Sequence, residues 1–72
     1  MRLRLKELRE DNDIFQKEIA DYLNIKQQTY SRYELGIGNP PLPIMEALAK
    51  YYNTSVDYLM GLTNEKKPYP RV

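Results

Sequence analysis

The chain has 72 residues, of which 42% are hydrophobic and 29% charged. This length and composition predict one globular domain near the lower size limit for folding around its own core. The chain contains no cysteine and no histidine, and its net charge is only +1. Disulfides and cysteine-ligated metals are therefore excluded, the commonest general base and metal ligand are missing, and we expect no metal or other cofactor.

The N-terminal stretch MRLRLKELRED carries acidic residues within its first ten positions and has no uninterrupted apolar run. It therefore does not have the pattern of a secretory signal peptide. Elsewhere no apolar run approaches the ~20 residues of a membrane span. We expect a cytoplasmic protein without a membrane partner.

The first predicted helix covers residues 2–11. Leu5 and Leu8 are three positions apart and form its inner stripe. Its charged residues suit either a solvated face or a basic end that touches a phosphate. The following Asp-Asn-Asp cluster is typical of the turn that ends a helix.

The central stretch QKEIADYLNIKQQTYSRYEL has the pattern of two short helices. Ile19 and Leu23 are four positions apart and share one helix face, whereas Tyr30 and Tyr33 share a face of the next helix. Asn24 lies between the pairs and tolerates the left-handed backbone that ends a helix abruptly. This layout predicts a helix-turn-helix.

The stretch resembles the phage repressor/Cro (XRE) family of DNA-binding domains. The residues that carry the resemblance are Gln16, Ile19, Ala20, Leu23, Ile25, the run QQTYSRYE from Gln27 to Glu34, and Gly36. The resemblance spans roughly residues 2–62. It implies an all-α fold, a compact five-helix bundle of the lambda-repressor-like type with the helix-turn-helix at helices 2 and 3. The expected organisation is a DNA-binding domain over 1–62 and a polar, flexible tail over 63–72.

The candidate recognition helix covers residues 26–35. Because Tyr30 and Tyr33 face the core, four polar side chains face outward; the candidates for base contacts are Gln27, Gln28, Ser31 and Arg32. A glutamine amide can pair with adenine and an arginine guanidinium with guanine. The alternative is that this ridge is only solvated surface.

A second set of residues is expected at the DNA backbone. The candidates are Gln16, Lys17, Lys26, Thr29 and Asn39. Gln16 opens a helix, where backbone N–H groups can grip a phosphate, although a merely polar first-turn role is the alternative. Phe15 and Lys26 stand where the family usually places capping residues, and Phe15 would instead act as an apolar staple against Ile19.

Two further groups have structural roles. The resemblance implies an ion pair between Arg9 and Glu34, which would tie the first helix to the end of the third. The fourth helix, 42–52, places Leu42, Met45, Leu48, Ala49 and Tyr52 on one stripe, with Ile44 off it. In the fifth, 56–61, the apolar excess of Tyr58, Met60 and Leu62 serves either core closure or self-association.

The leading hypothesis is a sequence-specific regulator of transcription that binds double-stranded DNA, similar to a small Cro-like or immunity regulator of a phage or mobile element. It would bind a palindromic operator as a homodimer. The alternative is a protein-interaction module of the antirepressor or antitoxin type. The low net charge and the loop 37–41, which carries no lysine or arginine, favour that alternative. An enzyme is disfavoured, since no acidic, lysine or tyrosine pair is placed to converge.

Overall fold

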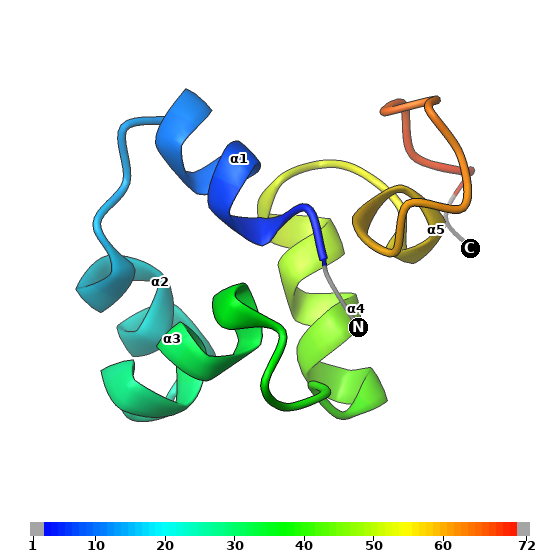
Figure 1. Cartoon of the computed structure of the whole chain (residues 1–72). Coiled ribbons are helices and arrows are strands. Elements are labelled where there is room, and N and C mark those ends of the chain that lie inside the picture. Colours follow the sequence, from blue (N-terminus) through cyan, green and yellow to red (C-terminus); the bar gives the residue numbers. More distant parts are fainter. Residues whose placement is uncertain (1–2, 71–72) are drawn as a thin grey trace.

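The computed structural model describes residues 3–70, which form helices and connecting loops with no strand. The helices are α1 (Leu5–Asp11), α2 (Gln16–Leu23), α3 (Gln27–Leu35), α4 (Leu42–Tyr51) and α5 (Val56–Leu59), shown in Figure 1. The prediction of an all-α, five-helix fold is confirmed. The predictions for residues 1–2, at the start of the domain and its first helix, and for residues 71–72 of the tail concern positions outside the described residues.

The helices pack so that the α2–α3 pair forms one end of the molecule. α2 packs on α3, α4 packs on α5, and α1 and α4 contact α3 and α2 respectively. In Figure 1 the α2–α3 pair lies on one side of α4, and α5 lies on the other with the C-terminal segment. The two helices of the motif are therefore supported from behind while their outer faces remain in solvent.

The core is formed by apolar side chains from all five helices, together with Leu3 before α1 and Tyr52 after α4. Its buried residues are Leu3, Leu5, Leu8, Ile19, Ala20, Leu23, Tyr30, Met45, Leu48, Ala49, Tyr52 and Leu59. The inward positions predicted on α1, α2 and most of α4 are confirmed. Burial of this apolar surface is the main term that stabilises the fold.

Two predictions about apolar side chains were wrong. Leu42 is 63% exposed because it is the first residue of α4 and lies about one turn before Met45, the first buried residue of that helix. Ile44, predicted to lie off the buried stripe, packs against the core instead. Phe15 is 76% exposed and is not a staple against Ile19. At the N-terminus of α2 the backbone N–H of Phe15 instead donates to the Glu18 carboxylate (3.4 Å).

Four helices are shorter than predicted. α1 begins at Leu5 because the Arg4 N–H donates to the Leu59 carbonyl (2.9 Å), which ties the preceding chain to α5. Leu3 is consequently buried without being helical. α3 begins one residue late, at Gln27, α4 ends one residue early and α5 two residues early.

Left-handed residues end both helices of the motif, as predicted. Asn24 has φ 58° after α2 and Gly36 has φ 75° after α3. The next N–H in each case reaches back into the helix, from Ile25 to the Ala20 carbonyl (3.0 Å) and from Ile37 to the Arg32 carbonyl (3.1 Å). These abrupt stops set the angle between α2 and α3.

The segment 63–70 lies against α4 and α5. The Thr54 hydroxyl donates to the Lys66 carbonyl (2.6 Å), and the Tyr69 hydroxyl donates to the Asp57 carboxylate (2.8 Å). A hollow of about 550 Å³ lies between this segment and the two helices. The flexibility of the tail stays a prediction. None of the described helices has the length and apolarity that crossing a membrane requires.

Candidate nucleic-acid interface

The outer face of α3 carries the four residues predicted to contact bases. Gln27, Gln28 and Arg32 are exposed and Ser31 is half-buried. Tyr30, on the opposite face, is fully buried. The helix therefore presents a polar ridge to solvent while an aromatic side chain anchors it to the core.

A hollow of about 340 Å³ brings residues of α2 and α3 together. It is lined by Gln16 from the first turn of α2 and by Gln27, Gln28 and Ser31 from the first half of α3. All four side chains are neutral and can both donate and accept hydrogen bonds. Such a surface matches the mixed donors and acceptors of a base edge and its neighbouring phosphate.

The N-termini of α2 and α3 both lack a side-chain cap. Phe15 and Lys26 occupy the cap positions, and neither makes a capping hydrogen bond through its side chain. First-turn N–H groups without a cap are satisfied by water or by an anion, and the helix dipole favours the anion. The N-termini of both helices are therefore suited to phosphate groups.

Two lysines flank the hollow along the chain. Lys17 follows Gln16, Lys26 precedes Gln27, and both lysines are exposed. Lys17 lies 3.5 Å from the Asp21 carboxylate in an exposed pair within α2. Such pairs contribute about 0.3–0.5 kcal/mol, so the lysine remains free to exchange this partner for a phosphate.

Thr29 and Asn39 lie outside the residues that line the hollow. Thr29 is half-buried within α3, and Asn39 is exposed in the loop between α3 and α4. That loop presents Ile37 to solvent, next to the exposed Leu35. Neither predicted contact is brought to the hollow itself.

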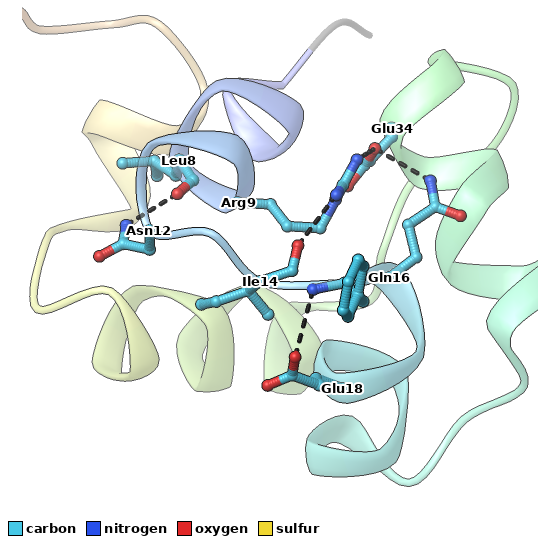
Figure 2. Close-up of polar contacts among 8 residues, drawn as sticks. Leu8, Arg9, Asn12, Ile14, Gln16, Glu18 and Glu34 are labelled. Atoms are coloured by element: carbon cyan, nitrogen blue, oxygen red, sulfur yellow. Dashed lines mark hydrogen bonds and ion pairs between the residues drawn. The ribbon is translucent and has the colours of Figure 1, made fainter.

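Arg9 and Glu34, the expected ion pair, are joined at two points in the structure. Arg9 Nε lies 2.6 Å from Glu34 Oε2, and Arg9 Nη2 lies 3.1 Å from Glu34 Oε1. Arg9 Nη1 also donates to the Ile14 carbonyl (3.0 Å). As Figure 2 shows, one guanidinium thus links α1, the loop before α2, and α3.

Gln16 joins this cluster, a contact that sequence reasoning missed. Its Nε2 donates to Glu34 Oε1 (3.1 Å), across 18 positions of the chain. Nothing in the local sequence pattern indicates the contact, because it depends on how α2 packs on α3. Gln16 therefore belongs both to the hollow and to the buried cluster behind it.

The Glu34 carboxylate is held in its charged form. Burial alone would raise its pKa, but interactions with Arg9, Tyr30 and Gln16 together outweigh burial and lower the pKa below the ordinary 4.5. The same pairing raises the pKa of Arg9. The ion pair is therefore intact at neutral pH.

Acid is expected to unfold the protein partly through Glu34. Because the pKa of Glu34 is lower in the folded state than the unfolded value of 4.5, its stabilising effect is complete above pH 4.5 and is lost as the pH falls through the folded-state pKa. Urea unfolding from pH 7 to pH 2 measures this loss. The Glu34→Gln variant should show a flatter pH dependence, and identical curves for the two proteins would contradict the assignment.

The candidate self-association face is only partly available. Tyr58 and Met60 are half-buried against the core, and the Arg4 guanidinium lies 4.4 Å from the centre of the Tyr58 ring. Leu62 is 70% exposed. Core closure therefore accounts for much of this apolar excess, and Leu62 remains unexplained by it.

The comparisons with known proteins agree with this geometry. Residues 5–59 match a family model described as Helix-turn-helix. The chain belongs to this helix-turn-helix family. The match covers α1 to α5, so the resemblance to phage repressors and Cro proteins is confirmed over the whole described bundle.

Members of the family from two bacteria are similar to this chain. It is 35% identical over 65 residues to the uncharacterized HTH-type transcriptional regulator YobD of Bacillus subtilis, covering 90% of this chain and 58% of that protein. It is 41% identical to the regulator ImmR of the same organism, covering 81% of this chain and 46% of ImmR. The repressor RstR of the cryptic phage CTXphi in Vibrio cholerae is 33% identical, with coverage of 81% and 52%. The chain thus spans about half the length of these relatives.

A solved structure shares the fold. The crystal structure of a transcriptional regulator from Listeria innocua superposes with a TM-score of 0.80 at 26% identity. The match covers 90% of this chain and 64% of that chain. The five-helix arrangement is therefore that of a solved transcriptional regulator.

Proposed function

We propose that the protein is a sequence-specific regulator of transcription that binds double-stranded DNA, with α3 in the major groove and the N-terminus of α2 on the backbone. One observation carries the proposal. The hollow at the outer end of the motif joins Gln16 of α2 to Gln27, Gln28 and Ser31 of α3, between two helix N-termini that lack side-chain caps.

Four side chains of α3 would contact base edges. Gln27 and Gln28 offer amides that match adenine, and Arg32 offers a guanidinium that matches guanine. Ser31, which is half-buried on the same face, offers a hydroxyl that can donate or accept. Gln27, Gln28 and Arg32 are exposed on this face of the helix, which supports this role.

The backbone would be held by a separate set of groups. Lys17 and Lys26 place positive charge beside the two helix N-termini, and Gln16 adds an amide there. Thr29 and Asn39 would contact phosphates at the margin of the interface. Phosphate contacts fix the register of the protein, and base contacts give specificity.

Useful affinity would require a homodimer, because one module of this size offers a small interface. The face formed by Tyr58, Met60 and Leu62 would join the subunits, and the exposed Leu62 supports that assignment. The two α3 helices would then lie about one turn, ~34 Å, apart on a palindromic operator.

Regulation would be steric: a dimer on its operator would exclude the transcription machinery from overlapping DNA in the cytoplasm. The similarity to RstR, which is a transcriptional repressor, supports this direction of control. The competing candidate, a protein-interaction module of the antirepressor or antitoxin type, is favoured by the exposed Leu35 and Ile37 beside a loop without cations. A steep salt dependence of DNA binding would argue against that candidate.

Gln28→Ala is expected to relax specificity at one base pair of each half-site. Loss of the amide removes a paired contact to one base, at a cost of ~1–3 kcal/mol in discrimination, while the fold stays intact because Gln28 is exposed. Competition between an operator and single-base variants of it measures the change. Glu46→Ala, on the exposed side of α4, serves as the control. Equal discrimination by wild type and Gln28→Ala would remove Gln28 from the base-reading set.

A further inference from the structure

The Glu34 carboxylate receives hydrogen bonds from two different helices. Arg9 of α1 donates to both of its oxygens, and Gln16 of α2 donates to Oε1. The side chain of Glu34 is only 3% exposed, whereas Gln16 reaches the surface at the hollow. A buried charge is thus connected to the candidate DNA-binding surface through one side chain.

The contact fixes which way the Gln16 amide faces. An ionised carboxylate only accepts hydrogen bonds, so the amide nitrogen must point toward Glu34. Figure 2 shows this arrangement, with the Gln16 nitrogen directed at Glu34 and its oxygen directed away. The carbonyl oxygen and the second N–H of the amide remain for other partners. Without the carboxylate, both amide orientations and several rotamers would be open to Gln16.

We infer that Glu34 is a positioning residue for DNA binding: by accepting a hydrogen bond from Gln16 Nε2, it holds the Gln16 amide at the edge of the hollow shared with α3. This inference rests on the proposed DNA-binding function. It gives the Arg9–Glu34 pair a second role, since the pair both fastens α1 to α3 and prepares Gln16 for its contact. Preorganisation of this kind raises affinity by removing the entropy loss of ordering a side chain at the moment of binding.

The test must separate positioning from stability, because loss of Glu34 alone strands Arg9. Two double variants share the Arg9→Met substitution and differ only at position 34. Arg9→Met/Glu34→Met replaces the pair by apolar side chains and removes the acceptor for Gln16, whereas Arg9→Met/Glu34→Gln keeps an amide oxygen as acceptor. Apolar replacement of a buried ion pair is often neutral for stability, and circular dichroism verifies that each variant is folded.

Operator affinity is then measured for the wild type and for both double variants, each with and without Gln16→Ala. The Arg9→Met/Glu34→Met variant should bind about threefold to tenfold more weakly than the Arg9→Met/Glu34→Gln variant, the range expected for one hydrogen bond. Adding Gln16→Ala should lower the operator affinity of the wild type and of Arg9→Met/Glu34→Gln by a similar factor. It should leave the affinity of Arg9→Met/Glu34→Met unchanged. Equal losses on adding Gln16→Ala to all three would overturn the positioning role.

A second measurement needs no DNA. In an acid titration followed by NMR, the side-chain amide resonances of Gln16 should shift together with the Glu34 carboxyl signal, at a midpoint below a glutamate's ordinary pKa of 4.5. Gln16 resonances that ignore the titration of Glu34 would refute the contact and with it the proposal. Failure of the wild type to bind any DNA would refute the proposed function as a whole, whereas tight wild-type binding with additive losses would refute the positioning role alone.

Discussion

Replacing Glu34 with alanine is expected to lower the free energy of unfolding by about 3–5 kcal/mol. The Glu34 carboxylate accepts hydrogen bonds from Arg9 and Gln16 and is almost fully buried. Its removal leaves Arg9, whose side chain is only 14% exposed, without a counter-charge. A loss of this size is a large share of the stability of a 72-residue domain.

Urea denaturation of Glu34→Ala against the wild type measures this effect. Glu46→Ala, an acidic residue exposed on α4, is the matched control and should change stability by about 0.5 kcal/mol or less. Adding Arg9→Met to a Glu34→Met variant should recover much of the loss, because no unpaired charge then remains. An unchanged unfolding midpoint for Glu34→Ala would show that the buried pair does not form in solution.

Raising the salt concentration from about 50 to about 200 mM is expected to weaken operator binding roughly 10²-fold. Lys17 and Lys26, the two cations assigned to the DNA backbone, are exposed on the helix-turn-helix. In a dimer each would release counterions from the DNA twice. This term must be local to the interface, since the chain as a whole carries a net charge of only +1.

Two single lysine substitutions, one as the test and one as its control, locate this charge effect. Lys26→Gln should reduce the slope of log affinity against log salt by about 2 for a dimer, one contact in each half-site. Lys50→Gln removes the same charge from the exposed side of α4 and should leave the slope as in the wild type. Equal effects of the two substitutions would mean that DNA does not lie on the outer face of α2 and α3.

The sequence predicts the elements of this fold well because the decisive features are local. The spacing of Ile19 and Leu23 marks one helix, Tyr30 marks the buried face of the next, and Asn24 and Gly36 mark the left-handed stops. Each of these depends on residues within one or two turns of the chain.

Features that depend on packing could not be predicted in the same way. Leu42 has the spacing of a core residue, but its place at the start of α4 leaves it in solvent. Helix α1 starts late because Arg4 is tied to Leu59, a contact across almost the whole chain. The hydrogen bond between Gln16 and Glu34 likewise depends on the approach of α2 to α3. The pattern of the residues assigns Gln16 to the DNA backbone but does not indicate its link to the core.

The central claim, that the outer face of α2 and α3 reads DNA sequence, is tested most directly by selection from random double-stranded DNA with the purified chain at two salt concentrations. We expect enrichment of a palindrome whose half-sites lie about one helical turn, ~34 Å, apart, with weaker recovery at the higher salt. Recovery of no common sequence at either salt concentration would contradict the claim and favour a protein partner in its place.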